Sequence, residues 1–163
     1  MLIHTLDITM KHCIKILGVK DVYIMERCER IEFSKVRLER AHEFLDAAVI
    51  NLENAHYLTA ANRAYYAAYS AIRALLILEH NEMVKHSGNL SEFRRHYIKT
   101  GLFKKEFSEY IRTLFVIRND SDYDPMYIIS KDEIAVQVEH AKDMVNEITS
   151  YLASVFDKDK KEI

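Results

Sequence analysis

Apolar residues recur at helical spacing along most of this chain and predict long amphipathic helices. In the segments of about 26–54, 57–80 and 104–123, apolar side chains three or four positions apart form a stripe, while charged residues fill the other faces. In the first segment the stripe consists of Val36, Ala41, Phe44, Leu45, Ala48, Val49 and Leu52. The second segment is rich in alanine, whose small side chain lets another helix approach closely, and its tyrosines 65, 66 and 69 are interpreted mainly as core residues.

The last predicted helix has the clearest start in the chain. Ser130-Lys131-Asp132-Glu133 has the pattern of a capping box, in which serine and glutamate side chains each bind the other residue's backbone N–H group. Apolar residues then alternate steps of four and three, as in a helix packed within a bundle: Ile134, Val138, Ala141, Val145, Ile148, Leu152 and Val155. A shorter helix is predicted at about 91–99, after a polar connection at 81–89, and Gly101 is expected to end it with a positive φ.

Composition supports an all-helical domain. Three glycines and one proline in 163 residues are too few for the many turns of a sheet protein, and this length is typical of one domain. The predicted fold is all-α, an antiparallel up-and-down four-helix bundle with an additional short helix. We assign the bundle to residues 25–157, an N-terminal extension of undetermined structure to 1–24, and a charged tail to 158–163.

Several function classes find no support in the sequence. The net charge of -2 creates no overall field that attracts nucleic acid. No secretion signal opens the chain, and the most apolar stretch, 67–78, is too short to span a bilayer, so we expect a cytoplasmic protein. Metal-ligand spacings, phosphate-binding glycine loops and nucleophile motifs are all missing, so neither a metal nor a cofactor is expected. A local basic patch is interpreted as solvated surface, with an RNA-backbone contact as the alternative: Lys85, Arg94, Arg95, Lys99, Lys104 and Lys105.

The candidate site is the stretch 117–124, at the end of the 104–123 helix and before the only proline, Pro125. Arg118 and Asp122 are four positions apart and share a helix face, and Tyr123 follows. In an antiparallel bundle, the end of this helix lies beside the start of the 57–80 helix. We therefore expect these three residues to approach Asn62, Arg63 and Tyr66. An ordinary Arg–Asp ion pair at a helix terminus is the alternative.

Three separated motifs together resemble the HEPN domain. They are Asn62-Arg63-Ala64-Tyr65-Tyr66-Ala67-Ala68-Tyr69, then Lys85-His86-Ser87-Gly88, then Ile117-Arg118-Asn119-Asp120-Ser121-Asp122-Tyr123, and the resemblance covers about residues 30–155. It implies a four- or five-helix bundle, usually dimeric, of prokaryotic toxin–antitoxin and defence systems. Active members are metal-independent endoribonucleases that use an arginine and, four to six residues later, a histidine at a cleft between two subunits. Many are partnered with a minimal nucleotidyltransferase antitoxin, which in some systems adds nucleotides to a tyrosine near the motif.

The sequence departs from this catalytic pattern after Arg118. Tyr123 stands where the histidine is expected, and the next histidine is His140. A phenol has an ordinary pKa of about 10, which makes it a poor general base near neutral pH. His86 replaces that histidine only if a partner subunit brings it to the cleft. The Arg-Asn-x-x-Asp-Tyr form is itself a familiar branch of the family.

Three functions are compatible with these residues. The first is a toxin-like HEPN protein, expected to be a homodimer, that binds RNA and cleaves it weakly without metal. Its candidate catalytic residues are Arg118, Tyr123 and Asp122, and its candidate binding residues are Arg63, Tyr66, Asn119 and Asn62. The alternative is a non-catalytic nucleotide- or substrate-binding subunit that partners a minimal nucleotidyltransferase, with Tyr123 as a modification site. The third is a dimeric scaffold in which the Arg118–Asp122 pair only ties helices together.

Overall fold

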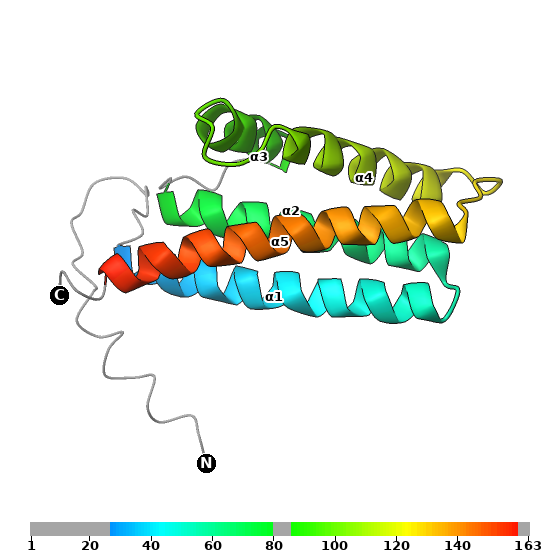
Figure 1. Ribbon diagram of the computed structural model, residues 1–163, viewed down its shortest axis with the longest axis horizontal. Helices are drawn as coiled ribbons and strands as arrows, with labels where there is room; N and C mark the ends of the chain where they lie inside the picture. The colour runs from blue at the N-terminus through cyan, green and yellow to red at the C-terminus, as the bar shows by residue number, and fades with distance from the viewer. Residues whose placement is uncertain (1–26, 80–85, 160–163) are drawn as a thin grey trace, which may run out of the picture.

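The computed structural model describes residues 27–79 and 86–159, and within these ranges the chain is helical and contains no strand (Figure 1). The four long helices are α1 (Arg27–Glu53), α2 (Tyr57–Glu79), α4 (Glu106–Tyr123) and α5 (Lys131–Asp159). Between α2 and α4 lie the short α3 (His86–Phe93) and a π-helical turn, Arg94–Ile98. The all-α prediction is confirmed for this part of the chain.

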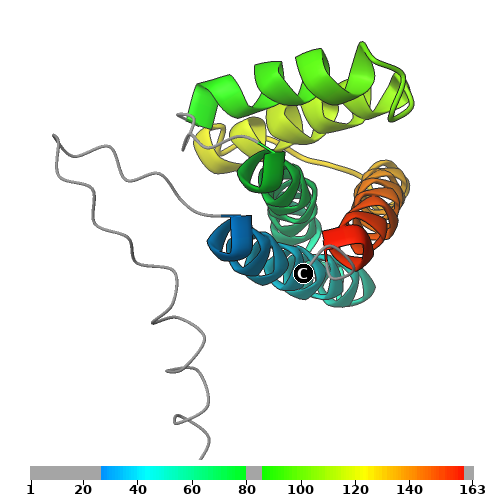
Figure 2. The same cartoon turned by 90° about the vertical axis from the view of Figure 1, so that its left-hand side faces the viewer.

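Helix α2 occupies the centre of the molecule. It packs against α1, α4 and α5, whereas the backbones of α1 and α4 are not in contact (Figure 2). Each long helix runs in the opposite direction to the long helix before it, as the colours along α1, α2, α4 and α5 show in Figure 1. The end of α4 therefore lies near the start of α2, which is the arrangement that the candidate site requires.

Small residues set the close packing of α1 on α2. Ser34, Ala41 and Ala48 recur every seven positions on α1 and are all fully buried, and the Ser34 hydroxyl donates a 2.8 Å hydrogen bond to the Ala74 carbonyl. The buried alanines of α2 are Ala60, Ala61, Ala64, Ala67, Ala68, Ala71 and Ala74. Val36, predicted to be part of the α1 stripe, is instead 56% exposed. The prediction for Val36 was therefore wrong. Val36 lies two residues after Ser34 and thus about 200° around the helix, almost opposite the buried Ser34.

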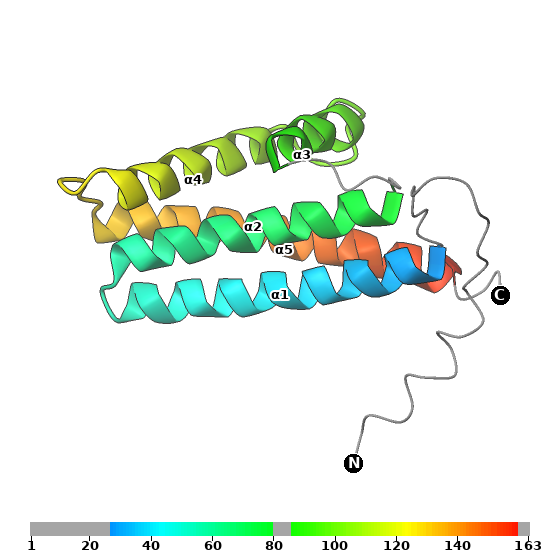
Figure 3. The same ribbon diagram turned by 180° about the vertical axis from the view of Figure 1, so that it is seen from behind.

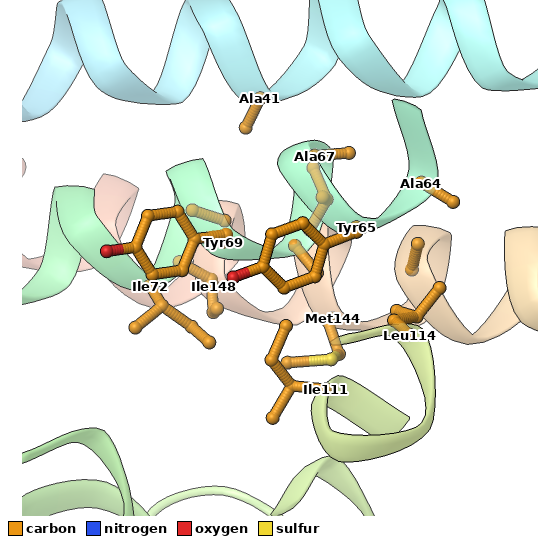
Figure 4. Close-up of a cluster of buried hydrophobic side chains, with 14 of the residues drawn as sticks. Ala41, Ala64, Tyr65, Ala67, Tyr69, Ile72, Ile111, Leu114, Met144 and Ile148 are labelled. Atoms are coloured by element: carbon orange, nitrogen blue, oxygen red, sulfur yellow. The ribbon is translucent and has the colours of Figure 1, made fainter. Parts of the chain in front are cut away.

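The core around α2 is aromatic and aliphatic. The rings of Tyr65 and Tyr69 stack with centroids 5.6 Å apart, and both side chains are buried among residues of α4 and α5, including Ile111 and Ile148 (Figure 4). Burial, reinforced by Tyr69 and Tyr66 and opposed by Arg118, raises the pKa of Tyr65 to about 12. The core interpretation is confirmed for these two tyrosines, whereas Tyr66 is only half-buried.

The connections follow the predictions with one exception. A short break joins the end of α1 to the start of α2 (Figure 3). It contains Ala55 with φ +61°, and Gly101 has φ +77°, as expected. Helix α3, however, begins at His86 rather than near Ser91, so residues 86–89 are not the loop that was predicted. Asn89 attaches this helix to α2, because its buried amide donates a 2.8 Å hydrogen bond to the Tyr69 hydroxyl.

The ends of α4 and α5 have the expected local chemistry. Asp124 leaves the helix with φ -104° and ψ 105° just before Pro125. At the start of α5, the Ser130 N–H group donates to a Glu133 carboxylate oxygen at 2.9 Å, and the Glu133 N–H group donates to the Ser130 hydroxyl at 3.2 Å. The capping box is therefore confirmed. The apolar residues predicted along α5 from Ile134 to Leu152 are buried.

Helix α5 continues to Asp159, two residues into the predicted tail, where the carboxylate accepts a 2.9 Å hydrogen bond from Arg27. Residues 160–163 and the predicted N-terminal extension at 1–24 lie outside the described ranges. Within those ranges, every helix is too short or too polar to cross a membrane.

Candidate functional site

Arg118 lies on the last turns of α4 and faces the start of α2. Its Nη2 atom donates to Asp122 Oδ2 at 2.7 Å and makes a longer, 3.4 Å contact with the Tyr66 hydroxyl on α2. Its Nη1 atom donates to Asn119 Oδ1 at 2.9 Å. The Arg118 side chain is 20% exposed, and its guanidinium lies 5.8 Å from the centre of the Tyr66 ring. The group is thus held in place by both helices while one side stays accessible.

Asp122 extends this contact to a second residue of α2. Its Oδ1 atom lies 3.5 Å from Asn62 Nδ2, which is the long limit of a hydrogen bond. The predicted approach of the end of α4 to the start of α2 is therefore present for Arg118, Asp122, Tyr66 and Asn62. The roles of these residues in binding or catalysis stay predictions.

The other two residues expected here lie at the edge of this group. Tyr123 is 79% exposed, and its hydroxyl makes no hydrogen bond with another described residue. Arg63 does not contact Arg118: its guanidinium lies 5.5 Å from the ring centre of Phe44 on α1. The Phe44 ring lies 5.7 Å from that of Tyr66, so one aromatic side chain separates Arg63 from the residue that Arg118 touches.

Three buried polar atoms in this region have no hydrogen-bond partner among the described residues. They are Arg118 Nε, Asn62 Oδ1 and the hydroxyl oxygen of Ser121, which precedes Asp122. Buried polar atoms in folded proteins are nearly always hydrogen-bonded, so unpaired ones require an explanation. Here the three atoms are enclosed by the protein beside the Arg118–Asp122 pair, so a ligand reaches them only when neighbouring side chains move.

The electrostatics keep Arg118 charged. Burial by itself lowers the pKa of its guanidinium, but Tyr66, Asp122 and Tyr123 together outweigh that effect, and the net shift is upward. A planar guanidinium matches the geometry of a phosphate group. A phosphate that binds on its exposed side competes with the Asp122 carboxylate for Nη2.

Within the described ranges, the hydrogen bonds and the ion pair that join Arg118 to Asp122, Asn119 and Tyr66 involve no histidine. His140 on α5 instead stacks on Tyr110, with ring centroids 3.7 Å apart and an interplanar angle of 7°. Tyr110 precedes Arg118 by eight residues, about 12 Å along α4. Burial, with a contribution from Lys104 and against the effect of Asp143, lowers the pKa of His140. His140 therefore belongs to the packing of α4 on α5.

Comparison with known proteins decides the family. The model of the HEPN domain matches residues 34–151 of this chain. The chain belongs to the HEPN family. It is 32% identical over 116 residues to a Thermotoga maritima protein named "UPF0332 protein", covering 71% of this chain and 83% of that relative. It is 31% identical over 131 residues to "Putative toxin MJ0142" of Methanocaldococcus jannaschii, covering 80% of this chain and 88% of that relative. The resemblance drawn from the three motifs is confirmed at the level of the family.

The basic patch predicted between α2 and α4 of this HEPN domain is compensated in part by acidic side chains, at Lys104 and Arg95. Lys104 lies 3.3 Å from Asp143 and 3.0 Å from Glu147, and Arg95 lies 2.6 Å from Glu92. Lys85 lies outside the described residues. These ion pairs are typical of a solvated surface, the interpretation that the sequence favoured.

Sequence reasoning missed a second group of arginines in the HEPN fold. A hollow of about 190 Å³ next to the Arg118 site is lined by Arg37, Arg40 and Phe44 of α1 and by Tyr66, Tyr69, Ser70 and Arg73 of α2. The α2 residues occupy positions i, i+3, i+4 and i+7, which is the spacing of a single helix face. That spacing was the signal available in the sequence. A larger hollow, of about 360 Å³, lies between α5 and residues 102–103 and contains none of the candidate residues.

No metal site accompanies these groups. Among the residues that the structure describes, no three His, Cys, Asp or Glu side chains are grouped in a way that could hold an ion.

Proposed function

We propose that this HEPN protein is toxin-like, that it binds RNA at the Arg118 site, and that it cleaves RNA weakly without a metal ion. The observation that carries the proposal is the way the Arg118 side chain is oriented and exposed. Its guanidinium is oriented by Tyr66, Asn119 and Asp122 while its side chain remains 20% exposed, so a positive charge is held in place with one side open to a ligand. Support also comes from the name of a relative, "Putative toxin MJ0142".

In the proposed reaction the ribose 2′-hydroxyl attacks the adjacent phosphorus, and the bond from phosphorus to the 5′-oxygen breaks. The products are a 2′,3′-cyclic phosphate and a 5′-hydroxyl. Arg118 donates from its Nη groups to the phosphate oxygens, on which negative charge develops in the transition state. Asp122 and Asn119 orient the guanidinium for this task.

Proton transfer explains why the activity is expected to be weak. The 2′-hydroxyl releases its proton to solvent, because no histidine base stands beside Arg118 in the described part of the chain. Tyr123, exposed and next to the site, donates a proton to the departing 5′-oxygen and recovers one from solvent. An enzyme with a positioned acid but no positioned base loses part of the usual gain from acid–base catalysis, which is about 10²–10⁴-fold.

A homodimer is part of the proposal. Apolar side chains are exposed around the end of α4 and the loop after it: Phe115 (39%), Val116 (42%), Met126 (82%) and Ile128 (88%). Exposed apolar residues gathered on one side of a monomer mark an interaction surface. A second copy packed there leaves the two Arg118 sites near the interface.

The proposal also includes the up-and-down four-helix bundle as the description of α1, α2, α4 and α5, and a cytoplasmic location for the protein.

One observation favours a second function. Because Tyr123 is 79% exposed and its hydroxyl is not engaged by the described residues, it is accessible to a modifying enzyme. In this alternative the protein is a non-catalytic binding subunit, and a minimal nucleotidyltransferase partner transfers nucleotides to Tyr123. Incubation with such a partner and ATP, followed by mass spectrometry, is expected to add nucleotide mass to wild type but not to Tyr123→Phe.

The test of the main proposal is RNA cleavage by the purified protein in the presence of EDTA. Wild type is compared with Arg118→Ala, Tyr123→Phe and the control Arg112→Ala, which removes an exposed α4 arginine paired with Glu109. We expect cleavage by wild type and by Arg112→Ala, no cleavage by Arg118→Ala, and a reduced rate for Tyr123→Phe. If none of the folded proteins cleaves RNA, or if Arg118→Ala cleaves as fast as wild type, the nuclease proposal is wrong.

A further inference from the structure

The hollow between α1 and α2 gathers three arginines around an aromatic wall. Arg37, Arg40 and Arg73 line it together with Phe44, Tyr66, Tyr69 and Ser70. Arg37 and Arg73 are half-buried and Arg40 is exposed. The hollow therefore presents guanidinium donors and a hydroxyl within a small volume of about 190 Å³. That volume is below the range of about 300–1,000 Å³ typical of pockets for drug-sized molecules, and it suits a single phosphate group better than a whole nucleotide.

Among the described residues, no acidic side chain compensates the positive charge in this hollow. No carboxylate of the described residues forms an ion pair with Arg37, Arg40 or Arg73, and these three arginines have no other acidic partner among those residues. Four other arginines do have acidic partners within 4.0 Å: Arg27, Arg95, Arg112 and Arg118. Arg30, Arg63 and Arg94 also form no ion pair with a described residue, so the distinctive feature of Arg37, Arg40 and Arg73 is that they line one hollow together.

The three charges also repel one another. Burial, and then the positive charges of Arg73 and Arg40, lower the pKa of Arg37, with only Tyr69 acting in the opposite direction. Neighbouring like charges on half-buried side chains destabilise the fold. A bound anion removes that repulsion, and planar guanidinium groups are well suited to phosphate oxygens.

Tyr66 connects this hollow to the Arg118 site. It forms part of the wall of the hollow, and its hydroxyl also contacts Arg118 Nη2 at 3.4 Å. A ligand with phosphates on either side of Tyr66 reaches both groups of arginines. A nucleic-acid strand has regularly repeated phosphates, whereas a mononucleotide bound at one of these places leaves the other unused.

We propose that the hollow formed by Arg37, Arg40 and Arg73 binds a backbone phosphate of the RNA strand whose neighbouring segment lies at Arg118. The inference rests on the proposed function and adds the second contact that positions the strand. Phosphate contacts of this kind fix the register of a nucleic acid without reading its sequence. The hollow supplies affinity, and Arg118 supplies the reactive contact.

The experiment is a salt titration of RNA binding. A fluorescent single-stranded RNA with 2′-O-methyl groups, which cannot undergo the cleavage, is titrated with protein over a series of KCl concentrations, and affinity is measured by anisotropy. For single strands the logarithm of affinity falls against the logarithm of salt with a slope of about -0.7 per neutralised phosphate. We expect the double variant Arg37→Gln/Arg73→Gln to bind about tenfold more weakly at low salt, and its slope to be shallower by about 0.7 for each phosphate that is no longer neutralised.

Controls separate the hollow from general charge. Arg112→Gln removes one exposed, paired arginine and is expected to leave affinity and slope unchanged. Circular dichroism melting checks that the variants fold. If the double variant does not fold, Arg40→Gln is used instead, because its side chain is exposed, and the same reduction in slope is expected.

The outcomes distinguish this inference from the proposed function. If wild type does not bind RNA at low salt, both are wrong. If wild type binds RNA but the hollow variants bind with unchanged affinity and slope, only the hollow inference is wrong. If ATP binding is lost in the hollow variants while RNA binding is kept, the hollow is a mononucleotide site and the RNA assignment is overturned. If those variants lose dimerisation instead of RNA affinity, the hollow is an interface between copies.

Discussion

Replacing Arg118 with alanine separates a functional arginine from one that merely ties helices together. If Arg118 serves a ligand, the substitution removes function and leaves the fold nearly as stable as before. If Arg118 serves the fold, the substitution unfolds the protein or destabilises it strongly. The interactions of Arg118 allow the expected change in the free energy of unfolding to be worked out.

Arg118→Ala removes three stabilising interactions. The ion pair with Asp122, between side chains that are 20% and 33% exposed, is worth about 0.5–1 kcal/mol at that accessibility. The 2.9 Å bond to Asn119 adds about 0.5–1 kcal/mol, and the 3.4 Å interaction with Tyr66 adds less. Against this, the substitution removes a buried Nε–H group without a partner, whose desolvation costs about 1–3 kcal/mol. The two sides nearly cancel, so the free energy of unfolding is expected to change by no more than about 1 kcal/mol.

Urea denaturation followed by circular dichroism measures this change. A domain is typically stable by about 5–15 kcal/mol, so Arg118→Ala is expected to remain folded. Tyr123→Phe is the matched control and is expected to change stability very little, because this side chain is 79% exposed. A loss of more than about 4 kcal/mol in Arg118→Ala, which is exceptional for a point substitution, would refute the functional interpretation and favour the scaffold.

The remaining predictions concern the fold. Ser130→Ala removes the capping box of α5 and is expected to cost about 1 kcal/mol in urea denaturation, with Ser130→Thr largely retaining stability. Asn89→Ala removes the buried 2.8 Å bond to Tyr69 and is expected to cost about 1–3 kcal/mol; an unchanged melting temperature would show that α3 is not anchored there. Burial lowers the pKa of His140 in the folded protein. As pH falls, His140 is therefore protonated in the unfolded chain at a higher pH than in the folded protein. The corresponding stability is complete above about pH 6.5 and is lost as pH falls through that value toward the lower folded pKa. His140→Phe keeps an aromatic ring on Tyr110 and should therefore lose less stability than wild type between about pH 7 and pH 5; equal losses would contradict this account.

The features predictable from the sequence are those governed by local rules. Ser130 and Glu133 form a capping box because their spacing alone places each side chain at the other's N–H group. Pro125 ends α4 because it restricts the residue before it. The approach of Arg118 to Tyr66 followed from helix order and antiparallel direction, without knowledge of any tertiary distance.

The features that were missed depend on how helices rotate and pack against each other. Val36 is exposed because α1 turns its small residues, such as Ser34, toward α2, and a stripe of hydrophobic residues does not encode that preference for small side chains. The attachment of α3 to α2 depends on Asn89 reaching a hydroxyl twenty residues away in sequence. The hollow between α1 and α2 combines residues of two helices, so the α2 spacing by itself could have indicated only the four lining residues of α2.

The most direct test of the central claim is to observe the Arg118 side chain while RNA binds. Arginine Nε–H groups give NMR signals, and the Arg118 signal is assigned by its absence in Arg118→Ala. During titration with a short 2′-O-methyl RNA, we predict that the Arg118 Nε–H signal shifts and saturates, whereas that of Arg112, paired with Glu109 on the exposed face of α4, does not. RNA binding that leaves the Arg118 signal unmoved would contradict the account, because the strand would then lie elsewhere on the protein.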